Sequence, residues 1–347
     1  MQAHTRARRA RRSLTAAALS FLTLLWAASD ATAATEGAVT DSETRQSLEE
    51  AWWTGPILAA SAASAPRGHF QIEPYFYDSI VVGHFDQDGR HLSVSRTHSV
   101  RSSTFFLYGL SDRVSVGVIP IVGFNRASDG SRSKLGLGDL SLQAQYRMTD
   151  FEPGRPIPTT SILLGATLPT GRYERLGSRL EDGLGSGAYT ATASVYSQYL
   201  FWLPTGRFLR TRLDVSFSIS DHVNLHDASV YGTPQGFRGY AAPGDTFAAY
   251  VSGEYSVTRN WVLAFEVAYQ HADNTRVIGR NLMALARAAE VIECNTNSGS
   301  SRSTVLAPEL EYSWSGRVGL LAGVIFTVSG RNVGETITPA LAINYNL

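Results

Sequence analysis

Apolar and polar residues alternate along most of the chain, in runs that begin near Phe70. In the run LRTRLDVSFSISD, residues 209–221, the odd-numbered positions are mainly apolar, whereas Arg210, Arg212 and Asp214 occupy even-numbered positions. Successive side chains of a β-strand point to opposite faces, so this strand has one apolar face and one charged face. About twelve runs of this kind follow one another, each long enough to cross a bilayer as a tilted strand. The pattern predicts an all-β protein.

The connections between these runs alternate between two lengths. Short turns are expected near residues 111–113, 203–206, 258–260 and 314–316, with a modest link at 150–158; long loops are expected near 84–93, 125–134, 172–187, 221–244 and 271–303. Outer-membrane barrels have short periplasmic turns and longer extracellular loops. We therefore predict a closed antiparallel transmembrane β-barrel of about 12 strands over residues 68–347, located in the cell outer membrane. A soluble barrel or sandwich also solvates one face of its sheets, but it has no reason for this asymmetry.

The first residues have the composition of an export signal. Residues 6–12 are rich in arginine, residues 14–28 are apolar, and residues 31–33, Ala-Thr-Ala, fit a cleavage site with small residues. The apolar stretch is shorter than the roughly 20 residues that a spanning helix needs. We therefore predict a signal peptide over residues 1–33 and a periplasmic segment over residues 34–67.

Composition narrows the classes of function. Lys+Arg 30 balance Asp+Glu 30, so no basic excess indicates a nucleic-acid partner. Cys294 is the single cysteine, and it cannot form an internal disulfide or a thiolate zinc site. We expect no nucleic-acid partner, no cofactor and no metal site.

Two enzyme sites are conceivable in the long loop near residues 221–244. His222 and His226 are four residues apart, which suits zinc on a helix, but no helical pattern surrounds them. His226 and Ser229 are similar to the serine and histidine of outer-membrane phospholipases, yet both lie in a predicted loop. We predict that the chain is not an enzyme and has no catalytic residue. A barrel hydrolase acting on lipids and a structural or adhesive barrel stay as alternatives.

Several short motifs carry a resemblance to a known family. They are Leu135-Gly136-Leu137-Gly138-Asp139-Leu140 with Gln145-Tyr146-Arg147, then Leu168-Pro169-Thr170-Gly171, Gly183-Leu184-Gly185-Ser186-Gly187, and Trp53-Thr54-Gly55-Pro56 near the start. In these motifs the chain resembles the MetA-pathway of phenol degradation family of outer-membrane transporters. The resemblance implies a closed barrel that passes small hydrophobic or aromatic compounds by passive diffusion, and it brings no catalytic residue.

The polar face of the predicted strands carries charges of both signs. The predicted pore-lining residues are Glu73, Asp139, Arg147, Arg210, Arg212, Asp214, Glu254, Glu266, Glu309 and Glu311. Mixed charges in a narrow pore pair with one another and position water, so we expect no strong anion selectivity. The alternative is a structural network that fills the barrel.

Two further segments lie outside the strand pattern. Residues 48–66, with Trp52 and Trp53, are too apolar for a free tail; they form either a plug that enters the barrel from the periplasm or an extension along its rim. Residues 281–292, NLMALARAAEVI, have apolar residues at helical spacing and predict a helix that enters the mouth or covers neighbouring loops. The expected partners are outer-membrane lipid and lipopolysaccharide, a small-molecule solute and the barrel-assembly machinery.

Overall fold

A computed structural model describes residues 45–281 and 292–347, and the side chains of residues 292–294 are not part of the description. The predicted signal peptide, residues 1–33, lies outside the described residues, and so do residues 34–44. The predicted helix at residues 281–292 also falls mostly outside them: Asn281 ends one strand, Ile292 begins another, and only the residues between are left out. No helix in the described part of the chain has the length and apolarity to span a membrane.

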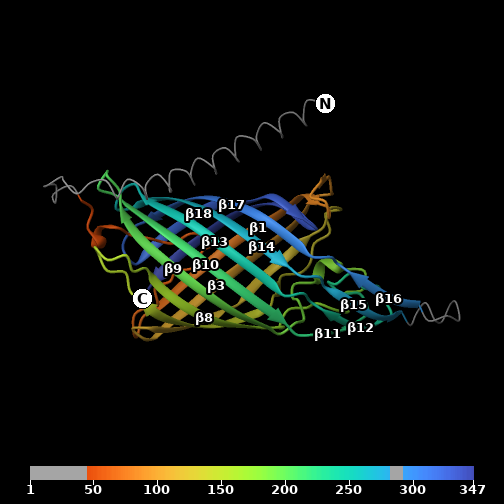
Figure 1. Cartoon of the computed structure of the whole chain (residues 1–347). Coiled ribbons are helices and arrows are strands. Elements are labelled where there is room, and N and C mark those ends of the chain that lie inside the picture. The colour runs from red at the N-terminus through yellow and green to blue at the C-terminus, as the bar shows by residue number, and fades with distance from the viewer. Residues whose placement is uncertain (1–44, 282–291) are drawn as a thin grey trace, which may run out of the picture. The chain divides into compact units, whose positions relative to one another are not determined.

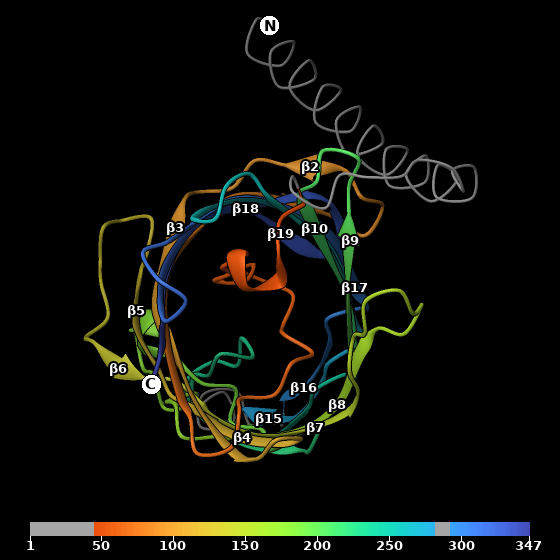
Figure 2. The ribbon, with the colours of Figure 1, turned by 90° about the vertical axis from the view of Figure 1, so that its left-hand side faces the viewer.

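Twelve antiparallel strands form the wall of a closed barrel (Figures 1 and 2), if β4 and β5 are counted as one wall strand because Pro120 divides it. In chain order they are β1 (Phe70–Phe85), β3 (Thr97–Ser111), β4 (Val114–Ile119) with β5 (Ile121–Arg126), β7 (Leu140–Thr149), β8 (Thr159–Leu168), β9 (Thr190–Trp202), β10 (Phe208–Ser220), β13 (Thr246–Ser256), β14 (Trp261–Ala272), β17 (Ser301–Ser313), β18 (Val318–Arg331) and β19 (Val333–Asn346). β1 pairs with both β3 and β19, which closes the wall and leaves no open edge of the barrel.

The alternation in β10 has the orientation that the sequence predicts. Leu213 is 50% exposed on the outer surface, whereas Asp214 is 2% exposed on the inner surface. Aromatic side chains gather on the outer surface near the short turns, where the Trp261 and Tyr312 rings lie 4.6 Å apart and Trp314 follows at 5.2 Å from Tyr312. An apolar belt bounded by aromatic residues is the surface that a bilayer requires.

The short turns gather at one end of the barrel and the long loops at the other, with one exception. The exception is the connection between β18 and β19, which consists of Asn332 alone in the left-handed conformation, with φ of 47°. The long loops carry small elements of their own: η2 (Leu180–Asp182), β2 (His91–Leu92) and β6 (Gly136–Leu137). The short 3₁₀ helix η1 (Leu48–Glu50) precedes β1.

A second sheet projects from the end with the long loops (Figure 1). Its strands, in spatial order, are β11 (Val223–His226), β12 (Phe237–Ala242), β15 (Arg276–Asn281) and β16 (Ile292–Asn297). The predicted long loops over residues 221–244 and 271–303 therefore contain short strands that the sequence pattern did not predict. Leu225, Phe237 and Val277 are buried beneath the sheet against Tyr173 and Tyr231, and this small apolar core stabilises strands of only four to six residues.

Candidate functional site

The barrel interior contains a stretch of the chain that precedes the first strand. We call residues 46–66 the entry segment. Gln46 donates its backbone N–H to Gly206 in the turn between β9 and β10, 3.0 Å away, and the Ser64 hydroxyl donates to the carbonyl of Asp112 in the turn between β3 and β4, 2.9 Å away. Both ends of the entry segment therefore lie at the end with the short turns, and the residues between them loop into the barrel (Figure 2).

Carboxylates on the barrel wall bind the backbone of the entry segment. Glu311 accepts the N–H groups of Thr54 at 2.7 Å and of Gly55 at 3.0 Å. Glu309 accepts the N–H of Ile57 at 3.0 Å. An extended segment without a strand partner leaves its N–H groups unpaired, and each would be costly to bury alone. The carboxylates therefore replace the ladder that a neighbouring strand would supply.

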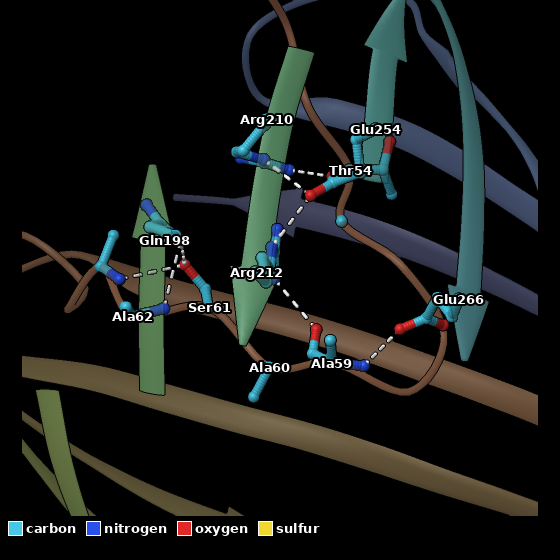
Figure 3. A network of polar contacts seen from close by, with 12 residues as sticks. Thr54, Ala59, Ala60, Ser61, Ala62, Gln198, Arg210, Arg212, Glu254 and Glu266 are labelled. Atoms are coloured by element: carbon cyan, nitrogen blue, oxygen red, sulfur yellow. Dashed lines mark hydrogen bonds and ion pairs between the residues drawn. The ribbon is translucent and has the colours of Figure 1, made fainter. Parts of the chain in front are cut away.

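The same arrangement continues deeper in the barrel (Figure 3). The two carboxylate oxygens of Glu266 accept the N–H groups of Leu58 at 2.7 Å and Ala59 at 2.6 Å, and Asp214 accepts the N–H of Ala60 at 2.6 Å. We call Asp214, Glu266, Glu309 and Glu311 the carboxylate row. Its members come from β10, β14 and β17.

Two buried arginines complete the contacts on this side of the barrel. Glu254, fully buried on β13, accepts bonds from Arg210 and, through Oε1, from the Nε of Arg212 at 3.0 Å. Arg212 also donates Nη1 to the carbonyl oxygen of Ala59 at 3.0 Å (Figure 3). The Arg210 guanidinium lies 4.4 Å from the centre of the Trp53 ring, a cation–π contact. Glu254 thus binds both arginines, while the carboxylate row binds backbone amides of the entry segment.

Gly55 is the position where the entry segment turns. Its φ of 102° is accessible to glycine and strained for other residues, and a Cβ there would lie 3.3 Å from Nη2 of Arg212. The turn lets Thr54 and Gly55 present both N–H groups to one oxygen of Glu311. The glycine of the Trp-Thr-Gly-Pro motif is therefore required by the path of the segment.

Uncharged polar residues hold the returning half of the entry segment. The side-chain oxygen of Gln198 accepts the N–H of Ala62 at 3.2 Å, and Gln145 donates its amide to the carbonyl of Ser61 at 3.0 Å. The Ser161 hydroxyl donates to the carbonyl of Ala62 at 2.5 Å. Gln198, Gln145 and Ser161 are not among the predicted pore-lining residues, all of which are charged. Strand alternation alone nevertheless places Gln145 on the inner face.

The remaining predicted pore-lining residues lie apart from the carboxylate row. Glu73 is buried on β1, where Gln71 donates to its Oε2 at 3.4 Å. Arg147 lies at the short-turn end, where it donates to the carbonyl of Asp112 at 2.6 Å and pairs with Asp150 at 2.9 Å. Asp139 lies at the opposite end, among the long loops. The structure thus brings seven of the ten residues together around the entry segment, namely Arg210, Arg212, Asp214, Glu254, Glu266, Glu309 and Glu311.

The two tryptophans of the entry segment occupy different places. Trp52 stays at the rim, where the guanidinium of Arg259 lies 4.0 Å from its ring centre. Trp53 lies further in, on Arg210. The segment therefore enters the barrel between these two residues, with one ring at the rim and one inside.

An apolar patch lies next to the carboxylate row on the barrel wall, where Leu321 of β18 pairs with Glu311 of β17. Tyr75, Leu321, Ala340 and Ala342 are buried there around Ile57. A cavity of about 410 Å³ extends beside the entry segment, lined among others by Tyr75, Phe105, Leu107, Leu163 and Gln143. The wall beside the entry segment therefore carries charged and apolar side chains next to each other.

Asp139 ties two long loops together at the outer end of the barrel. Its Oδ1 accepts the N–H of Gly171 at 3.0 Å, and its Oδ2 accepts both the N–H and the hydroxyl of Ser186 at 2.7 Å each. The Thr170 hydroxyl donates to the carbonyl of Gly138 at 2.8 Å. A second cavity, of about 860 Å³, opens at this end between β1, β3, β5 and the loop that carries Leu180.

Comparison with known proteins decides which family this barrel belongs to. The family model described as "Putative MetA-pathway of phenol degradation" matches residues 78–343, more than half of the chain. The chain belongs to this family. The prediction made from the short motifs is therefore confirmed. No curated protein matches the chain.

Solved structures resemble the barrel of this family member. The COG4313 outer membrane channel from Pseudomonas putida F1 is 16% identical with a TM-score of 0.62, and the match covers 84% of this chain and 100% of that chain. The NanC porin is 9% identical with a TM-score of 0.39, covering 80% and 100%. The β domain of the Bordetella autotransporter Brka is 11% identical with a TM-score of 0.41, covering 81% and 100%. The first match confirms the predicted outer-membrane barrel fold, and the fold with its apolar belt agrees with the predicted outer-membrane location.

The motifs by which the chain resembles the phenol-degradation family converge in space. The Leu-Gly-Leu-Gly-Asp motif supplies Asp139, the Leu-Pro-Thr-Gly motif supplies Gly171, and the Gly-Leu-Gly-Ser-Gly motif supplies Ser186. A Cβ at Gly185 would lie 2.5 Å from Oδ1 of Asp139, so this approach requires glycine. The motifs therefore build one loop junction around a single carboxylate.

Replacing Asp139 by asparagine should loosen this junction. Asparagine keeps one acceptor oxygen, so either Gly171 or Ser186 loses its partner, and the loss of charge-assisted bonds costs about 1 to 3 kcal/mol. Trypsin should then cleave faster after Arg172 or Arg175 in the intact barrel. Asp129→Asn is the matched control, because Asp129 is exposed in another long loop and accepts only within its own turn. Equal cleavage of the two variants would contradict the role of Asp139.

The residues of the enzyme alternative have other partners. Nδ1 of His226 lies 3.0 Å from a carboxylate oxygen of Glu174. The Ser229 hydroxyl lies 2.7 Å from the hydroxyl of Thr233 and is buried. His226 and Ser229 therefore do not form the hydrogen-bonded pair that activates a serine nucleophile. His222 lies beside Asp221, at 3.7 Å.

Proposed function

We propose that this chain is an outer-membrane channel through which small hydrophobic or aromatic compounds diffuse passively, and that the entry segment is its plug. One observation carries the proposal: a separate stretch of chain lies inside the barrel and is bound there by side chains of the wall. In the described part of the chain, no backbone–backbone hydrogen bond joins residues 51–65 to a barrel strand. Between its two ends, side chains of the wall hold the entry segment, so this part can leave while the wall stays closed.

The proposed solute class rests on the family and on the interior. The family is described by a pathway of phenol degradation, and the barrel fold is shared with a protein that is named an outer membrane channel. Tyr75, Phe105, Leu107 and Leu163 form an apolar part of the inner cavity, whose other wall residues include Glu73, Gln143 and Arg210, and apolar surface of this kind suits small apolar ligands. The proposal includes no catalytic residue and no cofactor. It also places lipid and lipopolysaccharide around the belt and assigns insertion to the barrel-assembly machinery.

The predicted pore-lining residues have defined places in this proposal. Once the entry segment withdraws, the carboxylate row, Glu73, Glu254, Arg210 and Arg212 face a water-filled path. Arg147 lies at the periplasmic end of that path and Asp139 at the outer end. The charges on the path then have mixed signs, which gives no strong preference for anions.

Uptake by cells tests the function. A strain that lacks this chain should take up radiolabelled phenol and toluene more slowly at low external concentration than the same strain complemented with the wild type. A strain complemented with a His226→Ala/Ser229→Ala variant should match the wild type, because those residues play no part in diffusion. Uptake that is equal with and without the chain would contradict the channel. Loss of phospholipid hydrolysis in the double variant would support the hydrolase instead.

A further inference from the structure

The entry segment makes two independent kinds of contact with the barrel. Its backbone binds the carboxylate row and Arg212, contacts that do not depend on side-chain identity. Residues 59–65 are only alanine and serine. Ile57 and Leu58 are the large aliphatic side chains between Trp53 and Pro66. Trp53 packs on Arg210, so Ile57 and Leu58 are the side chains of the segment that an apolar part of the wall recognises.

These two side chains occupy the apolar patch on β1, β3, β18 and β19. Ile57 is 7% exposed and packs in one cluster with Tyr75, Leu321 and Leu58. Gly323 lets the chain approach closely, because a Cβ there would lie 2.7 Å from Cδ1 of Ile57. An aliphatic side chain thus fills a site that the bare wall would leave open.

The patch contains the aromatic geometry that binds flat apolar molecules. The Tyr75 and Phe105 rings meet edge to face at 5.5 Å, and the Tyr75 and Tyr77 rings stack at 5.7 Å. Rings in these arrangements accept a further ring against a face or an edge. The 410 Å³ cavity, which Tyr75 and Phe105 also line, continues the patch beside Ile57. A small aromatic compound therefore has both a surface to bind and a way to reach it.

We propose that this patch is the binding site for the apolar solute and that Ile57 and Leu58 occupy it as an internal competitor, so that bound solute displaces the entry segment. The inference rests on the proposed function, because it takes the solute to be small and apolar. Two occupants of one site exclude each other, so each lowers the apparent affinity of the other. The solute opens its own path, and the channel stays filled when no solute is present.

Competition makes a specific prediction for Ile57→Ala in the full-length protein. Burying one isoleucine side chain favours docking of the entry segment by about tenfold or more, so the entry segment of Ile57→Ala should dock on the patch more weakly by that factor. The dissociation constant for toluene, measured by calorimetry on the purified barrel in detergent, should fall about tenfold, because the solute no longer competes with a tightly docked segment. Basal conductance in planar bilayers should rise in the same variant.

Two companion variants make the outcome decisive. Leu48→Ala removes a large apolar side chain from the same segment, but Leu48 is 42% exposed and lies outside the patch. The dissociation constant for toluene and the basal conductance of this variant should therefore stay at wild-type values. Phe105→Leu in the Ile57→Ala background removes a ring from the wall and should weaken toluene binding again. Toluene binding of equal strength in the wild type and Ile57→Ala would contradict the competition but leave the proposed solute class standing. If toluene binds neither protein, both the competition and the proposed solute class are contradicted.

Discussion

Deletion of residues 48–66 should raise the single-channel conductance of the barrel several-fold in planar bilayers. The entry segment lies inside the ring of strands (Figure 2) and is bound to Glu311 and Asp214, so its removal leaves a polar, hydrated wall in place of these contacts. The barrel should still assemble, because the first wall strand begins at Phe70 and none of the strand ladders involves the deleted residues. The measurement is the current through single purified barrels at fixed voltage and salt.

The deletion also removes two acidic residues, so charge needs its own control. Glu49 and Glu50 are exposed and make no contact with the carboxylate row. A Glu49→Gln/Glu50→Gln variant should therefore keep the conductance of the wild type. Wild-type conductance in the deletion itself would show that the entry segment does not limit the current. The path would then lie elsewhere in the barrel.

Val215→Arg should prevent most of the protein from assembling in the outer membrane. Val215 points outward from the middle of β10, with Val195 and Ala249 opposite it on the neighbouring strands. An arginine on the lipid face near the bilayer midplane costs about 2 to 4 kcal/mol. The amount of heat-modifiable barrel in outer-membrane fractions, compared on gels before and after boiling, measures the loss.

Ser216→Arg is the matched control for this variant. Ser216 is the next residue on the same strand and points inward, opposite Ser194 and Ala248. An arginine there has access to the polar interior, so assembly should stay near the wild-type level. Equal loss in the two variants would contradict the assignment of the two faces of β10. Recovery of the wild type in the soluble periplasmic fraction would contradict the membrane barrel altogether.

Much of the fold follows from local pattern. Alternation with period two fixes which side chains share a face, and in a barrel a face is either lipid or lumen. The inward positions of Arg210, Arg212 and Asp214 could therefore be predicted from one strand alone. The short turns could be predicted for a similar reason, because strand length and polar turn residues are local properties.

The outer sheet shows where the pattern is too short to predict a strand. Each of β11, β12, β15 and β16 has only four to six residues. β11 pairs with β12 and β15 with β16 within one loop each, but the sheet is completed only where β12 pairs with β15 of the other loop. Phe237 and Val277 belong to these two loops and are buried together against Tyr173 of a third loop. Nothing within a single loop signals that contact, so the sequence alone did not predict these strands.

Local sequence pattern predicts which surface of the barrel is apolar and which is polar, whereas the role of the polar inner surface depends on the path of the chain in three dimensions. Glu266 and Glu309 are 43 positions apart, and strand register places both beside the entry segment. Their partners are backbone N–H groups, which every residue except proline has, so no sequence motif marks them. Whether the inward carboxylates would meet water or the entry segment thus depended on the path of residues 46–66 through the closed barrel. Pairing and closure fix that path, because both ends of the segment are held at the same rim.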